Sequence, residues 1–197
     1  MKILFALFIL SSSIFAYDKT DLKNYLETKV CIECDLSNAN LSNKDLKNSD
    51  LSDTNLDGAI IENSDLTQSN LSGATLHNAN LDKTTFRISN FTNVEMSNIK
   101  CNKTIFKSVN FTDATLENIK CEDLNLYSAY FLDTSFENVD FTDTGAAFAK
   151  FTNIDFSEQK LSSIILWNAK ISDSIMTKEQ CSYAKKEDAI LTRVECN

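Results

Sequence analysis

A large apolar residue recurs at every fifth position of this chain from Leu36 to Met176, without one insertion or deletion. Leu, Ile, Phe or Met occupies each of these positions except Cys101, Cys121 and Ala146, which are also apolar. An α-helix repeats about every 3.6 residues and a strand about every 2, so neither maintains a register of five. A fixed internal repeat must therefore decide the fold.

A small residue stands two positions before most of the large apolar ones, as at Ala39, Ala59 and Ala74, and Asp or Asn commonly lies between the two. This Ala-(Asp/Asn)-Leu-x-x pattern resembles the pentapeptide-repeat family, and the match covers residues 34–178. The resemblance implies an all-β fold, a right-handed quadrilateral β-helix with four pentapeptides per coil. In such a solenoid the central Leu or Phe and the small residue face inward.

A recurring tetrapeptide supports a coil of 20 residues independently of the family. Asn98-Ile99-Lys100-Cys101 returns as Asn118-Ile119-Lys120-Cys121, which is 20 positions later. No single repeat can bury its own apolar residues, so stability requires many stacked coils.

The first 16 residues have the pattern of a signal peptide. Lys2 supplies a positive start, Ile3 to Leu10 an apolar stretch, and Ser11 to Ala16 a run toward a cut after Ala16. The alternative is a membrane anchor, but the apolar stretch is shorter than the ~20 residues that span a bilayer. We therefore expect a periplasmic or secreted protein, with no membrane span after cleavage. The mature chain would carry 18 basic and 28 acidic residues, a net charge of −10, and no nucleic-acid partner is expected.

Helical caps are predicted at both ends of the solenoid, because open ends expose core and unpaired backbone. In residues 17–33, Leu22, Tyr25 and Leu26 follow helical spacing. In residues 179–197, a helix opened by the capping-box pattern Thr177 to Gln180 is expected to run to about Asp188, followed by a tail. Two chains could also join end to end as a homodimer.

Six cysteines in an exported chain indicate disulfides. Cys181 and Cys196 flank the C-terminal cap and are the favoured pair. Cys31 and Cys34 form a C-x-x-C, interpreted as a structural pair that closes the first coil and not as a redox or metal site. Cys101 and Cys121 fall one above the other inside the tube. We expect them to be buried free thiols, because their side chains would run nearly parallel.

No residue pattern predicts catalysis, a cofactor or a metal. The one histidine, His77, falls at an outward repeat position and is interpreted as a solvated side chain. The acids that stack in neighbouring coils, Asp45 with Asp65 and Asp35 with Asn55, lack the ligand spacing of a calcium loop. We therefore predict that the protein is not an enzyme.

An apolar stripe occupies outward positions that should be polar, at Tyr127, Phe148, Ile165 and Trp167. Exposed aromatic clusters often mark interfaces, so these residues are the candidate interaction patch. Two other interpretations remain open. The C-terminal helix or tail could cover the stripe, or Phe148 could turn inward to fill the space left by Ala146.

Two functions follow from these features. The first is a non-enzymatic, exported interaction module or scaffold that presents a rigid surface to an unknown protein or envelope component. The second is a DNA-mimicking inhibitor of a topoisomerase, because some members of the family that the chain resembles imitate B-form DNA. The net charge fits the second hypothesis, whereas the signal peptide disfavours it because such targets are cytoplasmic.

Overall fold

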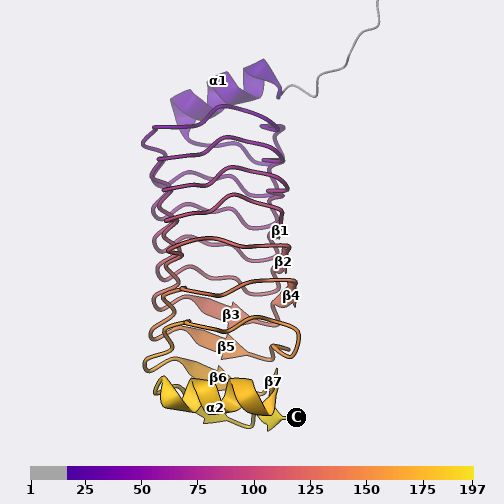
Figure 1. The fold of residues 1–197 in the computed structure, drawn as a ribbon. Coiled ribbons are helices and arrows are strands. Elements are labelled where there is room, and N and C mark those ends of the chain that lie inside the picture. The colour runs from indigo at the N-terminus through magenta and orange to yellow at the C-terminus, as the bar shows by residue number, and fades with distance from the viewer. Residues whose placement is uncertain (1–16) are drawn as a thin grey trace, which may run out of the picture.

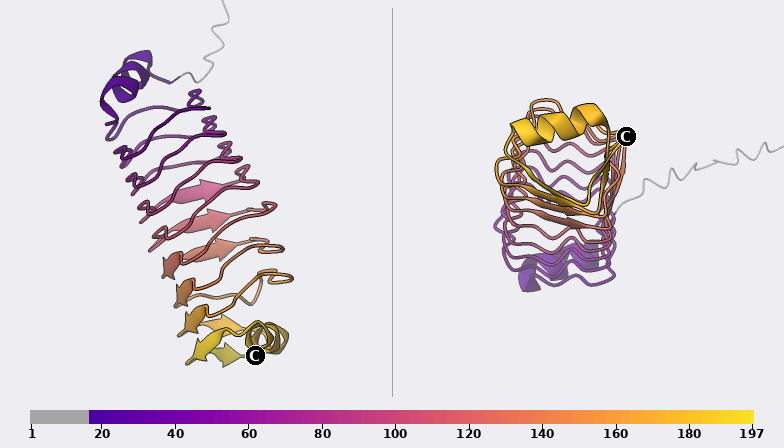
Figure 2. Two further views of the ribbon diagram at one scale, coloured as in Figure 1. Left: turned by 90° about the vertical axis from the view of Figure 1, so that its left-hand side faces the viewer. Right: turned by 90° about the horizontal axis from the view of Figure 1, so that it is seen from below.

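The computed structural model describes residues 17–197, and the predicted signal peptide lies outside that part of the chain. The described chain winds into a long, narrow column of stacked coils with one helix across each end (Figure 1). Seen along its axis, the column has a four-sided outline (Figure 2). The fold is the four-sided β-solenoid that the five-residue period predicts.

Neighbouring coils pair in parallel at an interval of 20 residues. Val30 pairs with Asp50 and Asp50 with Asn70, and this ladder continues through every twentieth residue to Ile190. The amide of Asp50 donates to the carbonyl of Lys29 in the coil before it (2.8 Å), and the amide of Leu51 donates to the carbonyl of Asn70 in the coil after it (2.7 Å). Inner coils thus bond to a neighbour on either side, which leaves sheet edges only at the two ends.

The corners of the column are tight turns that each contain a residue with a left-handed backbone. This residue lies two positions after the central apolar one, with φ of 59° at Asn38 and 55° at Asp53. Asn and Asp tolerate this conformation better than other residues that carry a Cβ, which explains how a chain with three glycines can turn so often. Gly58 and Gly73 occupy the same kind of position, where an added Cβ would collide with Asn38 or Asp53 in the preceding coil.

Short strands form in the second half of the column. The strands β1 (Glu95–Ser97), β2 (Thr115–Glu117) and β4 (Ser135–Glu137) make one parallel sheet in the order β1-β2-β4. A second sheet has the order β3-β5-β6-β8, with β3 (Tyr130–Leu132), β5 (Lys150–Thr152), β6 (Lys170–Ser172) and β8 (Ile190–Thr192). The last pair is β7 (Ile175–Met176) with β9 (Glu195–Cys196). Because β8 and β9 pair onto the coil before them, the segment predicted as a tail contributes a further layer to the solenoid.

The interior is filled by the central residues, which change from Leu in the early coils to Phe in the later ones. Phe131 stacks nearly parallel between Phe111 (4.9 Å between ring centroids) and Phe151 (4.8 Å). The small residue beside each central one is buried too, and where it is Ser or Thr its hydroxyl needs a partner. The hydroxyl of Thr84, for example, donates to the carbonyl of Ile61 at 2.7 Å. Large side chains and satisfied hydroxyls therefore fill the tube together.

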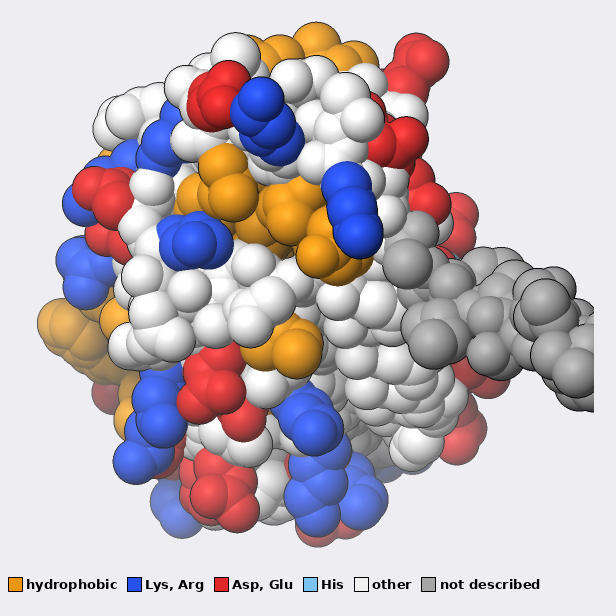
Figure 3. All heavy atoms as spheres, turned by 90° about the horizontal axis from the view of Figure 1, so that it is seen from above, with side chains coloured by type: hydrophobic (Ala, Val, Ile, Leu, Met, Phe, Trp, Pro, Cys, Tyr) orange, Lys and Arg blue, Asp and Glu red, His pale blue; other side chains and the backbone are white. Residues whose placement is uncertain are grey.

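The helix α1 (Lys19–Thr28) covers the N-terminal end of the column. It begins at Asp18, whose carboxylate accepts hydrogen bonds from the amides of Thr20 and Asp21. Its one fully buried side chain is Tyr25, which donates from its hydroxyl to Ser49 (3.0 Å), and burial raises the pKa of Tyr25 to about 12. Seen from this end, apolar side chains gather on the surface with lysines beside them (Figure 3).

The helix α2 (Lys178–Lys186) covers the other end and begins with the predicted capping box. The hydroxyl of Thr177 accepts from the amide of Gln180, and the side chain of Gln180 accepts from the amide of Thr177. The amide group of the same Gln180 side chain donates to the carbonyls of Phe156 (2.7 Å) and Gln159 (2.9 Å), which fastens the helix to the last coils. Within residues 17–197, no helix has the length and apolar character needed to cross a bilayer.

Candidate interaction surface

The candidate patch lies on one corner of the solenoid, where the chain turns between two of its sides. Tyr127 and Trp167 stand two coils apart in the same column, with Ala147 between them, as the pairing of Asn125 with Gly145 and of Gly145 with Ile165 requires. Backbone bonds connect the coils at this corner, because the amide of Ser128 donates to Ala147 (2.9 Å) and the amide of Phe148 to Trp167 (3.0 Å). The corner is therefore part of the rigid wall.

Three aromatic rings form a continuous exposed row on this corner, which we call the aromatic corner (Tyr127, Phe148 and Trp167). The centroid of Phe148 lies 5.3 Å from that of Tyr127 and 4.9 Å from that of Trp167. Tyr127 and Phe148 keep 38% and 37% of their surface exposed, and Trp167 keeps 53%. Ile165 is also 53% exposed and lies two residues before Trp167 on the outer side of the wall. The sequence prediction thus named residues that the fold brings together.

The geometry at Phe148 differs from both alternative interpretations of the stripe. Phe148 remains at the surface, and Ala146 and Ala149 are completely buried without it. The exposure of Trp167 shows that α2 and the following strands leave the corner uncovered. Phe148 also has φ of 59°, a position that Asn, Asp or Ser fills in most other turns. A left-handed backbone costs a residue with a Cβ about 1–2 kcal/mol, so contacts such as those with the neighbouring rings must compensate for it.

Cationic side chains border the aromatic corner. The ammonium of Lys107 lies over the ring of Tyr127, 4.7 Å from its centroid. Lys150 in β5 and Lys170 in β6 are exposed and directly paired, two residues after Phe148 and three after Trp167. Sequence reasoning missed both lysines, although the 20-residue interval between them was a signal that could have found them.

The structure pairs Cys181 with Cys196 and Cys31 with Cys34, the two pairings that the sequence favoured. Their Cα atoms lie 6.1 Å and 5.4 Å apart, within the range for disulfides. The first pair ties α2 to β9, and the second closes the turn that follows α1. Both bonds therefore staple the ends of the solenoid.

Cys101 and Cys121 differ from the expectation of buried free thiols, because the structure joins them as a third disulfide inside the tube. Both residues are buried, and their Cα atoms are 5.2 Å apart. The expectation assumed a regular ladder with parallel side chains. The preceding residues, Lys100 and Lys120, instead pair with Asn80 and with Asp140, but not with each other. This local break in the ladder releases the two coils from the strict register that would keep the sulfur atoms apart.

His77 has polar partners that the sequence reading did not foresee. Its Nδ1 lies 2.7 Å from the hydroxyl of Ser97, and its Nε2 lies 3.7 Å from the carboxylate of Glu95. Hydrolase triads combine the same three groups, with the hydroxyl open to a substrate carbonyl. Here Ser97 is only 9% exposed, which gives its hydroxyl little access to a substrate. The arrangement is better explained as a corner contact between successive coils.

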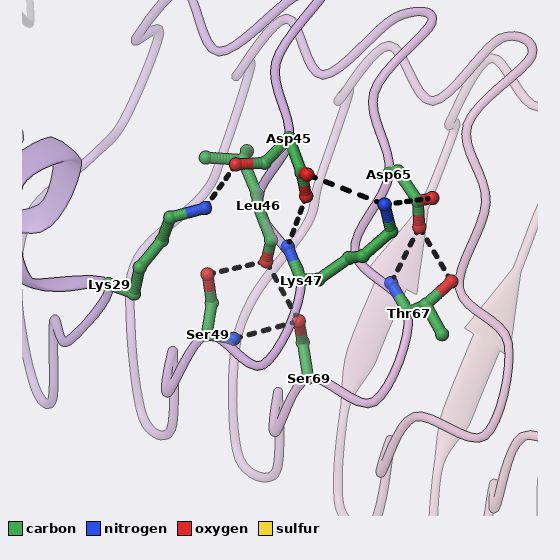
Figure 4. A network of polar contacts seen from close by, with 8 residues as sticks. All are labelled: Lys29, Asp45, Leu46, Lys47, Ser49, Asp65, Thr67 and Ser69. Atoms are coloured by element: carbon green, nitrogen blue, oxygen red, sulfur yellow. Dashed lines mark hydrogen bonds and ion pairs between the residues drawn. The ribbon is translucent and has the colours of Figure 1, made fainter.

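The stacked acids of the early coils are arranged around a lysine (Figure 4). The ammonium of Lys47 lies 3.4 Å from the carboxylate of Asp45 and 3.3 Å from that of Asp65. The pKa of Asp45 is lowered by the backbone amide and then by the ammonium of Lys47. Within the described residues, no group of three His, Cys, Asp or Glu side chains is placed to hold a metal ion. These acids neutralise a cation of the chain itself.

Comparison with known proteins matches the chain to the family profile of pentapeptide repeats, in eight copies over residues 31–68, 69–100 and 104–143. These segments cover more than half of the sequence. No curated protein matches.

Several solved structures share the likeness at low identity. Full-length QnrB1, a plasmid-mediated fluoroquinolone resistance protein, is 15% identical, with 65% of this chain and 75% of that one covered and a TM-score of 0.41. The pentapeptide repeat protein Rfr23 from the cyanobacterium Cyanothece 51142 is 19% identical, with 64% and 96% covered and a TM-score of 0.26. A pentapeptide repeat protein from the thylakoid lumen of Arabidopsis thaliana is 14% identical, with 74% and 77% covered and a TM-score of 0.30. Likenesses at this level carry no inference about activity.

Proposed function

This chain belongs to the pentapeptide-repeat family, and on that premise we propose that it is an exported, non-enzymatic module that binds a partner protein through its aromatic corner. The observation that carries the proposal is the exposed row of Tyr127, Phe148 and Trp167. Aromatic rings at the surface are hydrated at a cost that burial in an interface removes, and Tyr and Trp are the residue types that dominate binding energies.

The rigidity of the wall supports a binding role for this corner. Backbone hydrogen bonds hold Ser128 and Phe148 to the coils that follow them, so the rings need little ordering when a partner docks. Binding sites that are ordered beforehand lose less conformational entropy on association. A flexible loop with the same three rings would bind more weakly.

Export is supported by two independent features of the chain. Residues 1–16 have the order of charges and apolar residues typical of a signal peptide. All six cysteines are placed in pairs, and disulfides persist mainly in oxidising compartments such as the periplasm. Sequencing the N-terminus of the protein recovered from fractionated cells should find Tyr17 as the first residue, in the periplasm or the medium. An intact Met1 in the cytoplasm would contradict export.

The DNA-mimic hypothesis has less support, because the acidic residues do not form uninterrupted rows. Lys47 lies between Asp45 and Asp65, and in the later coils Lys120 and Lys160 lie 4.0 Å and 3.6 Å from Asp140. An imitation of DNA needs a regular surface of unneutralised negative charge. We expect the mature protein to leave DNA supercoiling by gyrase unchanged even at high molar excess, and inhibition would revive this hypothesis.

Site-specific photocrosslinking in cells tests the interaction surface. A photoreactive amino acid in place of Trp167 should give a discrete crosslinked product, and Tyr127→Ala in the same chain should reduce it by at least half. Ile60 is the matched control, because it is 40% exposed on a different side of the solenoid. Equal products at both positions, or none at position 167, would remove the aromatic corner from consideration.

A further inference from the structure

We propose that the partner of the aromatic corner presents a short acidic polypeptide segment with an apolar anchor residue. This inference rests on the proposed function and adds the chemistry of the partner to it. The observation behind it is a pair of unneutralised lysines beside the three rings. The rings would take the apolar anchor, and the lysines would take the carboxylates.

The lysine pair is Lys150 and Lys170, which occupy equivalent positions in β5 and β6. Both side chains leave the outer face of the sheet, because Phe151 and Ile171, the residues after them, are buried in the core. Two like charges directly opposite each other on neighbouring strands destabilise a sheet. A bound carboxylate would turn this repulsion into attraction.

No acidic side chain of the described chain neutralises the pair. Neither lysine takes part in an ion pair within residues 17–197, although Lys47, Lys83, Lys120, Lys160 and Arg193 do. The cross-strand neighbours of the pair in the same sheet are Tyr130 and Ile190, which carry no charge. The acids Glu187 and Asp188 follow in the next coil and make no ion pair with them. The positive charge is thus available to a partner.

The surroundings favour a short polypeptide over other anions. The mature chain has a net charge of −10, so a long polyanion such as DNA or an anionic membrane would meet repulsion along the rest of the column. A segment that spans only the coils of Phe148 and Trp167 would avoid most of that repulsion. It could also place an apolar side chain against rings that meet edge to face, with 77° between the planes of Phe148 and Trp167.

The experiment selects binders from a random dodecapeptide phage library on the mature protein and measures the affinity of the recovered peptides. We expect enrichment of peptides that combine Asp or Glu with a large apolar residue. The double variant Lys150→Glu/Lys170→Glu should weaken their binding about tenfold or more at low ionic strength, and added salt should reduce the difference. The matched control is Lys100→Glu/Lys120→Glu, which makes the same change of charge on another side of the wall and should have little effect.

The outcomes separate the two proposals. Peptides that lose affinity with Trp167→Ala but keep it with Lys150→Glu/Lys170→Glu would overturn the acidic partner and leave the aromatic corner as a binding site. An equal loss in the control variant would also overturn it, because general electrostatics would then explain the effect. Selected peptides that are indifferent to Trp167→Ala would reject the corner itself. Saturable binding to phosphatidylglycerol vesicles or to a DNA oligonucleotide, without any acidic peptide, would replace the polypeptide with another partner.

Discussion

The coils before residue 95 and those after it follow the same period but close their corners differently. In the early coils the amide after the left-handed residue commonly donates across the turn, as from Ala59 to the carbonyl of Leu56 at 3.0 Å. In the later coils the turns that end at Ile99, Ile119 and Ile154 lack this bond, and a strand precedes each of them. Every turn that ends at an alanine has the bond, in both regions.

The difference teaches that the small residue controls how tightly a corner closes. Alanine has little volume to place inside the tube, whereas isoleucine is β-branched and favours an extended backbone. The change from Leu to Phe in the core also requires a wider tube. Two interruptions of the ladders occur only in the later region, between Lys100 and Lys120 and between Ser135 and Asp155.

The largest expected effect is the loss of a ring from the later core. Phe131→Ala should lower the free energy of unfolding by about 4 kcal/mol, because it removes a buried ring and its two stacked partners. The matched change in the early core, Leu71→Ala, should cost about 3 kcal/mol. Urea denaturation of both variants measures the difference. A smaller loss for Phe131 would show that the later coils are more loosely packed than the stacked rings indicate.

Removal of the interior disulfide is expected to rank next. Cys101→Ala/Cys121→Ala should cost about 3 kcal/mol, because the bond closes a 20-residue loop that the unfolded chain would otherwise leave free. The Cys31–Cys34 bond spans only three residues and should contribute much less. Alkylation of the folded and the denatured protein, followed by mass spectrometry, tests the pairing itself. Labelling of Cys101 or Cys121 without a reductant would restore the original expectation of free thiols.

A smaller effect should follow from an exchange of the corner residues. Ala114→Ile should open the turn after Phe111 and cost about 2 kcal/mol through overpacking. The amide of residue 114 donates to the carbonyl of Phe111 at 3.2 Å, so its hydrogen exchange should become faster. Ala114→Val is the milder control, since Val94 and Val109 both close their turns. Unchanged protection in the isoleucine variant would show that the small residue does not control the corner.

The smallest effect concerns an ion pair of the later coils. Burial raises the pKa of Asp140, but hydrogen bonds from Thr142 and the charges of Lys160 and Lys120 outweigh it and hold this pKa below its usual value. A carboxyl whose pKa is lower in the folded state stabilises the protein above its unfolded pKa of about 3.9, and this contribution is lost as the pH falls through the folded value. Asp140→Asn should therefore cost up to about 1 kcal/mol at pH 7 and nothing near pH 2. A penalty that persists in acid would mean that packing, and not charge, is responsible.

The sequence predicted the solenoid, both capping helices and the residues of the aromatic corner. Each of these depends on a repeating pattern or on a local signal, such as the capping box that begins at Thr177. It did not predict the disulfide between Cys101 and Cys121 or the contact of His77 with Ser97. Those features depend on how one coil shifts against the next by a fraction of a residue, which no period records.

The sequence alone determined the coil of this protein, because a five-residue period with large apolar centres can bury its side chains in only one regular way. The tertiary structure decided which corners stay tight and which open, since that depends on the volume available inside the tube. It also decided that Phe148 remains outside with Tyr127 and Trp167 while Lys150 and Lys170 lie beside them. Contacts between coils set these positions, and such contacts exist only once the column is stacked.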